Sequence, residues 1–412
     1  MQDRSSANNL LHTDRRQMLA LLGSSLAAPL WAQGASHWSE IESRARGQTV
    51  YFNAWGGSQR VNAYLQWAGV EAQQRFGVRL EHVKLSDTAE VVKRVRNEKA
   101  AGKVAGGSVD LVWINGENFL AMKREGLLFG PFAESLPNFR YVDLVGKPTT
   151  QIDFSEPVQG MEAPWGMAQL TFFADSTRVA QPPLSMAELL QFARQHPGRV
   201  TYPRPPDFLG TTFLKQALIE LHANRSALYR PVTPQTLETL GAPLWKYLDA
   251  LHPHLWRAGK QFVQNAATMR QMLSDGELLL AFTFNPNEVA NEIAAKRLAA
   301  SVASYQLNSG PGVGTIGNTH FLAIAFNASA RDAAQVLANF LLSPQAQARK
   351  ADITVWGDPT VLALDKLSAA ERELFTGSAA PGQVRQPMPA IPEPHGSWVD
   401  PLEREWLRRY GQ

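Results

Sequence analysis

The chain has 412 residues, more than one hydrophobic core of about 250–300 residues usually supports, so we expect two lobes. Hydrophobic residues make up 44% and charged residues 19%, which is typical of a folded globular protein and excludes a largely disordered chain. The formal charge is +3 and the 40 basic residues form no Lys/Arg-rich run, so we expect no nucleic acid partner.

The N-terminus has the pattern of an export signal. Arg15 and Arg16 precede an apolar run, 18–30, that ends near the small residue Ala32. The order of the arginines and the apolar residues after them resembles a twin-arginine signal, and a Sec signal with two arginines is the alternative. We expect residues 1–32 to be removed on export. The apolar run is shorter than the roughly 18–20 residues that span a bilayer, so we expect no transmembrane helix.

The sequence contains no cysteine. This excludes disulfides, thiolate-held iron–sulfur clusters and cysteine-ligated zinc sites. It also leaves no residue for acylation, so we expect no lipid anchor. Because an exported protein without an anchor is retained only behind a second membrane, we expect the periplasm as its compartment.

The first part of the mature chain predicts alternating strands and helices. The expected elements are strands over 49–52, 78–83 and 110–114 and helices over 59–76 and 88–101. Helical spacing places five apolar residues on one face of the first helix: Val61, Tyr64, Leu65, Ala68 and Ala72. This alternation predicts a parallel sheet covered by helices, and ligands of such sheets bind beyond the carboxyl ends of the strands.

A Gly- and Pro-marked strand entry over 160–175 is interpreted as a crossover into a second lobe. That lobe is expected to contain a helix over 211–222 and strands over 277–284 and 302–307. The Gly-rich segment 309–317 is interpreted as a flexible return to a strand over 319–326. The Pro-rich stretch 381–394 is expected to be an extended surface segment.

The order of short motifs along the chain carries a family resemblance. The motifs are Phe76-Gly77-Val78, Asp110-Leu111-Val112-Trp113, the run from Phe119 to Leu128, Ala163-Pro164-Trp165-Gly166, Asp275-Gly276-Glu277, the strand from Phe321 to Asn327 and the helix from Ala333 to Ala348. This order resembles the extracellular solute-binding proteins of ABC transporters of the maltose, polyamine, iron and thiamine type. Within that superfamily it is most similar to the YnjB-like binding components, over nearly all of the mature chain.

The resemblance implies an α/β protein with the two-lobed periplasmic-binding-protein fold of type II, whose lobes close over a ligand cleft. The implied divisions are 33–165 for the first part of lobe 1, 166–316 for lobe 2, 317–360 for the return to lobe 1, and 361–412 for a C-terminal segment that packs on lobe 2. The implied function is the periplasmic substrate-binding component of an ABC importer. As a monomer, it would deliver a small solute, cationic or heteroaromatic and thiamine-like or polyamine-like, to the membrane permease.

Candidate ligand-binding residues of the first lobe follow the ends of the predicted strands. They are Trp55, Gly57, Ser58, Asn115 and Glu117, together with Trp165 at the inferred hinge. The Trp55 ring can stack on a cationic or flat ligand, or it can be a packing tryptophan. Gly57 and Ser58 open a helix whose free amides favour an anionic or carbonyl group, and Ser58 can equally be an ordinary N-cap.

The second lobe supplies five further candidates: Arg204, Phe208, Thr211, Asn285 and Asn287. The first three offer an ion-pair donor, a stacking face and a hydroxyl, and the two asparagines flank a proline that stiffens their loop. Each can also be a plain turn residue. Glu117 with Asp207 and Glu288 would neutralise a cationic ligand, whereas Gly57 and Ser58 with Arg204 would hold an anionic one, and both ligand charges stay open.

Three enzyme-like patterns fail. His252-Pro253-His254 lacks a third ligand at metal spacing. The Gly-rich segment 310–317 precedes a strand instead of opening a helix, and no Gly-x-Ser-x-Gly elbow is present. We therefore expect no enzyme, no metal and no cofactor. The alternative is an exported hydrolase or lyase on a similar two-lobed scaffold, with Glu117 and Asp207 as acid and base.

Overall fold

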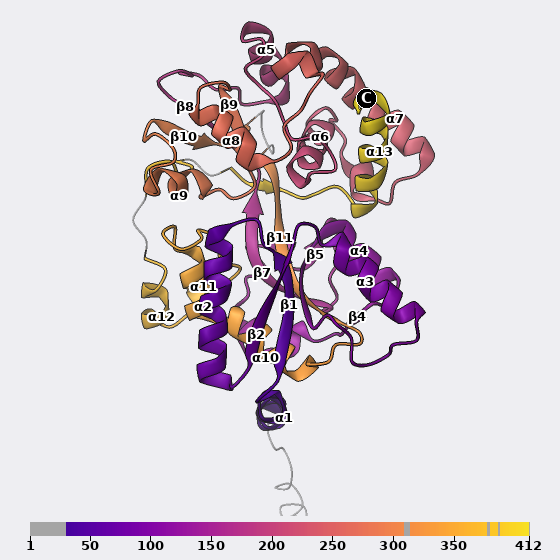
Figure 1. The fold of residues 1–412 in the computed structure, drawn as a ribbon, viewed down its shortest axis with the longest axis vertical. Coiled ribbons are helices and arrows are strands. Elements are labelled where there is room, and N and C mark those ends of the chain that lie inside the picture. The colour runs from indigo at the N-terminus through magenta and orange to yellow at the C-terminus, as the bar shows by residue number, and fades with distance from the viewer. Residues whose placement is uncertain (1–29, 309–313, 377–379, 386–387, 412) are drawn as a thin grey trace, which may run out of the picture.

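The computed structural model of the protein describes residues 30–308, 314–376, 380–385 and 388–411, and of residues 30–36 only the backbone. They form two lobes, one above the other along the longest axis (Figure 1). The signal predicted for 1–32 lies outside the described residues, apart from the first residues of helix α1 (Leu30–Ala45). None of the described helices is long and apolar enough to cross a membrane.

The first lobe is a sheet with helices on both faces. The strands of this sheet include β1 (Thr49–Trp55), β2 (Arg79–Leu85), β3 (Leu111–Ile114), β4 (Leu128–Phe129), β7 (Glu162–Gln169) and β11 (Thr315–Ala325). The short strands β5 (Ile152–Asp153) and β6 (Glu156–Pro157) form a separate two-stranded sheet. Besides α1, its helices are α2 (Gln59–Phe76), α3 (Ala89–Ala100), α4 (Gly116–Arg124), α10 (Arg331–Leu341), α11 (Pro344–Ala351) and α12 (Ala369–Glu373). Successive strand residues point to opposite faces, so Leu111 packs in the cluster of α2 and α10 while Val112 packs against α3 and α4.

The main sheet is mixed: β1, β2 and β3 are parallel, as predicted, but β11 runs antiparallel to β3, β4 and β7. Its strand order is β12-β11-β3-β1-β2, where β12 is the short strand Ala390–Ile391, and β4 and β7 also pair with β11. Strand β1 pairs in parallel with both β2 and β3. Helix α2 spans the predicted residues because Ser58 caps its start and Gly77, at a φ of 67°, ends it. The carboxyl ends of β1 and β3 therefore meet at the edge of the sheet that faces the second lobe (Figure 1).

Two chain passages along this sheet connect the lobes. Strand β7 leads into β8 (Thr171–Asp175), which is the central strand of the second lobe's β10-β8-β9 sheet. Strand β11 returns, pairing first with β12 (Ala390–Ile391) and then with β7 and β3. Part of the segment predicted as a flexible return, 309–313, lies outside the described residues. The strand predicted from residue 319 begins at Thr315, so residues 315–317 belong to β11 and not to a loop.

The second lobe surrounds its small sheet with helices. Besides β8, the sheet contains β9 (Leu280–Thr283) and β10 (Val302–Tyr305). The helices are α5 (Met186–Gln195), α6 (Phe208–Glu220), α7 (Pro234–Leu251), α8 (Ala266–Ser274), α9 (Glu288–Ala294) and α13 (Val399–Tyr410). Trp398 and Trp406 from the C-terminal end of the chain lie in the core of this lobe, beside Tyr202 and Phe213.

The C-terminal segment 361–412 divides between the lobes. Val361, Leu362 and Leu367 form a cluster with Val142 and Leu342 of the first lobe. Only the later part, with α13, packs on the second lobe. Residues 361–367 therefore lie on the first lobe, and not on the second lobe as expected. The remaining lobe boundaries stay predictions.

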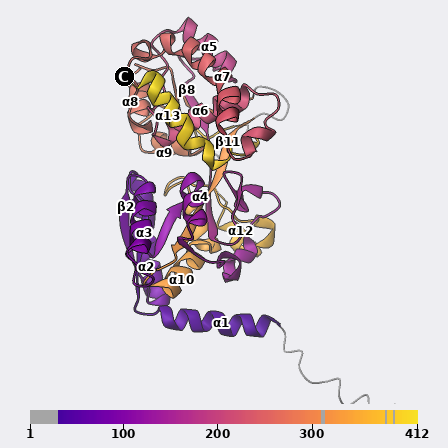
Figure 2. The same ribbon diagram turned by 90° about the vertical axis from the view of Figure 1, so that its right-hand side faces the viewer.

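Two other expectations need correction. The return helix expected over 333–348 is two helices, because Pro344 cannot continue α10 and instead begins α11 behind the cap Ser343. The Pro-rich stretch 381–394 is not wholly at the surface, since Ile391 and Glu393 are buried. Ile391 belongs to β12, which pairs with β11, and Glu393 pairs with the buried Lys215, before the chain runs into α13 (Figure 2).

Candidate functional site

Three predicted residues lie where β1 ends and α2 begins. Trp55 keeps 45% of its surface exposed. Gly57 lies under the Trp55 ring, and a Cβ atom on Gly57 would come within 2.5 Å of the ring atom Cζ2. Ser58 caps α2, since its Oγ accepts a hydrogen bond of 3.4 Å from the Val61 amide. The structure thus engages Ser58 in capping and leaves the Trp55 ring open to contact.

Asn115 and Glu117 lie at the start of α4. Asn115 occupies the N-cap position but makes no side-chain hydrogen bond to the helix. Asp153 makes the capping hydrogen bond instead: its Oδ2 accepts a hydrogen bond of 2.6 Å from the Gly116 amide. Glu117 lies in the first turn, where the free helix amides favour a negative charge, and its Oε1 accepts a hydrogen bond from Asn118. Capping is therefore assigned to Asp153, and Glu117 faces the second lobe.

The start of α6 holds the predicted residues of the Pro-rich loop. Phe208 is 42% exposed, and the Thr211 hydroxyl donates a hydrogen bond of 2.7 Å to Glu403 of α13. Asp207 caps α6 by accepting hydrogen bonds from two backbone amides. Arg204 donates to the carbonyl oxygen of Gly411, beyond the end of α13. Asp207, expected to face a ligand as a carboxylate, is thus used to begin a helix.

Asn285 and Asn287 lie at a different contact between the lobes. The Asn285 side chain accepts a hydrogen bond of 3.0 Å from the Asn287 amide, and the Asn287 side chain donates one of 2.7 Å to the carbonyl of Gly357 in the first lobe. Glu288, expected to be a free carboxylate, forms an ion pair with Arg270. These residues bind protein groups in this structure and are not brought together with Glu117.

Trp165 is completely buried in β7. Its ring packs edge-on against Phe52, Trp113, His320 and Trp356. No part of the ring is open to solvent, so contact between Trp165 and a solute would require this aromatic cluster to open.

The structure does bring together side chains of both lobes around Glu117. We call them the interlobe cluster: Asp87 and Glu117 from the first lobe, and Phe208, Thr211, Lys215 and Glu403 from the second. The carboxyl group of Glu117 interacts electrostatically with Lys215, Glu403 and Asp87. The Lys215 ammonium lies 5.7 Å from the centroid of the Phe208 ring. Side chains of the two lobes come together here because the start of α13 lies above the start of α4 (Figures 1 and 2).

Lys215 is the cation of the cluster, and its charge is already matched. Lys215 is 1% exposed, and its Nζ lies 2.8 Å from Oε2 of Glu393, a residue that is 2% exposed. Nζ also lies 4.3 Å from the centroid of the Phe154 ring, within reach of a cation–π interaction. Burial raises the pKa of Glu393, and Lys215 opposes that rise. Glu393 therefore partly offsets the effect of the Lys215 charge on the other carboxyl groups.

Three carboxyl groups of the interlobe cluster have no such match. Among the residues that the structure describes, Asp87, Glu117 and Glu403 form no ion pair with a lysine or arginine. Burial raises the pKa of Glu117 to about 7, Lys215 opposes the rise, and Glu403 and Asp87 add to it. Burial also raises the pKa of Glu403, against the hydrogen bond from Thr211. The cluster therefore favours a positive charge placed between the lobes.

Sequence reasoning missed Asp87, Lys215 and Glu403. Asp87 lies in the loop after β2, one residue beyond Ser86, so the rule that placed Glu117 after a strand end would have found it. Lys215 lies on α6, which is buried on nearly all sides, and a lysine in such a helix is itself a signal of a buried partner. Glu403 has no local signal, because it approaches the site only through the packing of α13.

The enzyme-like histidines have a structural role. His252 Nε2 lies 2.6 Å from the Tyr202 hydroxyl, which also accepts a hydrogen bond of 2.7 Å from the Trp406 indole. This chain of contacts ties α13 to the second-lobe core. Within the described ranges, no three side chains are grouped so that they could hold a metal ion.

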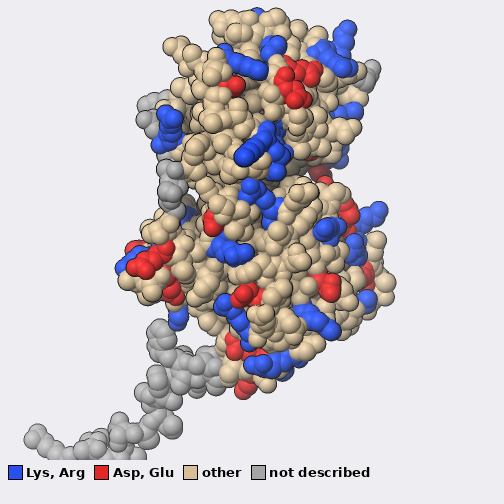
Figure 3. Space-filling view, turned by 60° about the vertical axis from the view of Figure 1, so that its left-hand side comes forward, with Lys and Arg blue, Asp and Glu red and all other residues tan. Residues whose placement is uncertain are grey.

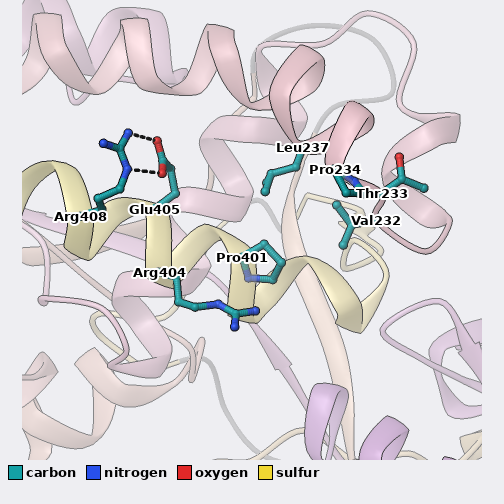
Figure 4. A pocket seen from close by; sticks show the side chains of 8 residues that line it. All are labelled: Val232, Thr233, Pro234, Leu237, Pro401, Arg404, Glu405 and Arg408. Atoms are coloured by element: carbon teal, nitrogen blue, oxygen red, sulfur yellow. Dashed lines mark hydrogen bonds and ion pairs between the residues drawn. The ribbon is translucent and has the colours of Figure 1, made fainter.

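A hollow of about 420 Å³ lies between the start of α7 and one face of α13 (Figure 4). It is lined by Val232, Thr233, Pro234, Leu237, Pro401, Arg404, Glu405 and Arg408. On its wall Arg408 is paired with Glu405 at 2.7 Å, whereas Arg404 lies 4.0 Å from Asp400 of α13. It includes none of the predicted site residues, and we assign it no ligand.

Comparison with known proteins defines the class. The chain belongs to the bacterial extracellular solute-binding proteins, whose family model matches residues 67–365. Protein YnjB of Escherichia coli (strain K12) is 49% identical over 387 residues, which cover 92% of this chain and 95% of YnjB. The protein is thus a solute-binding protein of the kind that serves ABC transporters, as the motif order predicted. This family consists of transport proteins, and no comparison supports the hydrolase or lyase alternative.

Solved structures show the same two-lobed fold at low sequence identity. The TpPotD lipoprotein of Treponema pallidum has a TM-score of 0.61 at 16% identity, covering 88% of this chain and 99% of its own. The spermidine/putrescine substrate-binding protein PotD of Streptococcus pneumoniae has a TM-score of 0.58 at 13% identity, covering 88% and 98%. AfuA of Actinobacillus pleuropneumoniae, solved with fructose-6-phosphate, has a TM-score of 0.60 at 14% identity, covering 88% and 99%. This fold therefore accommodates both cationic and anionic solutes, and the site must decide between them.

Proposed function

We propose that the protein binds a cationic small solute at the interlobe cluster and delivers it to an ABC permease. The observation that carries this proposal is the set of three unmatched carboxyl groups contributed by both lobes: Asp87, Glu117 and Glu403. A cation between them would replace the repulsion between like charges with attraction. Because the carboxyl groups belong to different lobes, the same cation would favour the closed arrangement.

Two exposed aromatic rings support the same ligand class. Trp55 ends β1 in the first lobe and Phe208 begins α6 in the second, and the two residues are 45% and 42% exposed. Aromatic faces attract cations and stack on flat rings. An extended polyamine and a charged heteroaromatic solute such as thiamine are therefore the two forms of cation to test first.

An anionic solute has less support. Ser58 is used as a helix cap and Arg204 as a donor to Gly411, so neither side chain stands ready for a phosphate or carboxylate. The face of the molecule in Figure 3 carries acidic and basic side chains side by side. We therefore do not infer an anionic ligand from a large basic surface.

We also propose how the protein is exported, where it is located and in what state it binds its solute. We propose export through a twin-arginine signal that ends near residue 32, a periplasmic location without a lipid anchor, a monomeric state and binding without turnover. The pair Arg15 and Arg16 supports the twin-arginine signal, and the absence of cysteine supports a location without a lipid anchor.

A thermal-shift screen of the mature protein tests the ligand class. Putrescine, spermidine and thiamine are compared with fructose-6-phosphate at equal concentration. A cation present at 100 times its Kd should stabilise the protein by about 2.7 kcal/mol. Stabilisation by fructose-6-phosphate alone would contradict the proposal, and chemical conversion of a bound solute would favour the hydrolase or lyase alternative.

A further inference from the structure

Charged groups of both lobes act on Glu117. Helix α6 supplies Lys215, helix α13 supplies Glu403, and the loop after β2 supplies Asp87. Behind Glu117, strand β5 supplies Asp153, which is buried and interacts electrostatically with Glu117. Among the described residues, Lys215 is the cation that lowers the pKa of Glu117, and it is directly paired with Glu393.

The second lobe also packs directly against Glu117. The backbone at Gly396, just before α13, lies over Glu117: a Cβ atom on Gly396 would be 3.4 Å from the Glu117 Cα. Second-lobe chain therefore lies against the backbone of the half-buried Glu117 and limits the water that would otherwise stabilise its ionised side chain. A carboxyl group in such surroundings holds a proton more readily than one in water.

We propose that Glu117 releases a proton when a cationic solute binds beside it, so that solute binding is coupled to proton release. The inference rests on the proposed function, because it requires a cation at the interlobe cluster. In the empty protein, the proton on Glu117 reduces the repulsion from Glu403 and Asp87. In the complex, the positive charge of the solute takes over that role, and Glu117 becomes a carboxylate that attracts it.

The direction of the pH dependence follows from this exchange. Burial holds the pKa of Glu117 at about 7 in the empty protein, and a bound cation lowers that pKa. Protons therefore compete with the solute, and affinity falls as the pH falls through 7. For a single group with these properties, binding should be about tenfold weaker at pH 6 than at pH 8, with about half a proton released at pH 7.

Isothermal titration calorimetry tests the coupling. The mature protein is titrated with the tightest binder among putrescine, spermidine and thiamine, at pH 6, 7 and 8. At pH 7 the titration is repeated in phosphate and in Tris, whose ionisation enthalpies differ, so that the dependence of the observed heat on buffer gives the number of protons released. This measurement on the unaltered protein needs no variant.

Two variants assign the proton to its group. Glu117→Gln should bind more weakly at pH 8 and should lose both the pH dependence around 7 and the buffer dependence. Glu134→Gln removes an exposed first-lobe carboxylate outside the cluster, and it should behave as the unaltered protein does. An unchanged pH dependence in Glu117→Gln would overturn the inference.

Failure of this inference can be told apart from failure of the proposed function. A cation that binds with the same heat in both buffers and the same Kd at pH 6 and 8 would overturn proton coupling and leave the cation site intact. No binding of any of the three cations at any of these pH values would contradict the proposed function, and the coupling with it.

Discussion

The Nζ atom of Lys215 lies 2.8 Å from Oε2 of Glu393, and this ion pair joins α6 to the segment that leads into α13. Both side chains are almost wholly buried. The pair matters for the site because α13 carries Glu403, and Glu403 meets Glu117 only if the C-terminal segment is held in place. A buried pair in the second lobe thus positions a carboxyl group that faces the first.

Removal of one member of this pair should be costly. Lys215→Met leaves Glu393 buried without its cation, and we expect a loss of about 3–5 kcal/mol in the free energy of unfolding at pH 7.5, measured by urea denaturation. The double variant Lys215→Met with Glu393→Gln leaves no buried charge, so it should be more stable than Lys215→Met alone. A double variant less stable than the single one would contradict this account of the pair.

The two tryptophans proposed at the site should behave differently. Trp165→Ala empties part of a buried aromatic cluster, so we expect a loss of about 3–5 kcal/mol in stability. Trp55→Ala removes an exposed ring, so stability should change by less than about 0.5 kcal/mol. Cation binding by Trp55→Ala should weaken by about 0.5–2 kcal/mol, measured by calorimetry. Equal destabilisation by both substitutions would show that Trp55 is a core residue.

Stability in acid should depend on Asp358. Burial alone would raise its pKa, but His320 and Lys350 outweigh burial and hold the pKa below its usual value. A carboxyl group with a lowered pKa in the folded state stabilises the fold above about pH 4, and this stabilisation is lost as the pH falls toward the folded-state pKa. Urea unfolding between pH 6 and 3 should therefore show a steeper loss in the unaltered protein than in Asp358→Asn.

The matched control for that experiment is Asp365→Asn, which removes an exposed carboxylate of the same lobe. Its stability should fall with pH as steeply as that of the unaltered protein. Parallel curves for Asp358→Asn and Asp365→Asn would show that the buried contacts of Asp358 contribute nothing to stability in acid.

Local sequence signals were enough to predict much of the fold. Helix α2 could be placed at both ends because its cap, Ser58, and its αL terminator, Gly77, act within one turn of the helix. The five apolar residues assigned to one face of α2 are all buried. The parallel order of β1 and β3 followed from the alternation of strands and helices, and it placed Glu117 at the edge that faces the second lobe.

Which residues form the site depends on contacts between distant parts of the chain, and local sequence signals do not predict such contacts. Thr211 and Glu403 are hydrogen-bonded across a separation of 192 positions in the chain. Asp207 was expected to bind a solute, but the same short side chain is also a favoured helix cap, and the structure uses it as one. Sequence alone could not tell these two uses of a carboxylate apart, because the difference lies in which backbone amides are free nearby.

The most direct test of the central claim, that both lobes hold one cationic solute through their carboxyl groups, is a double-variant cycle. The Kd of the tightest-binding cation is measured by calorimetry at pH 8 for the unaltered protein, Glu117→Gln, Glu403→Gln and the double variant. Loss of a charged contact typically costs about 1.5–3 kcal/mol, so each single variant should bind at least about tenfold more weakly, and the double variant more weakly still. Equal affinity of all four proteins, with Trp55→Ala also unaffected, would contradict the account and place the solute elsewhere.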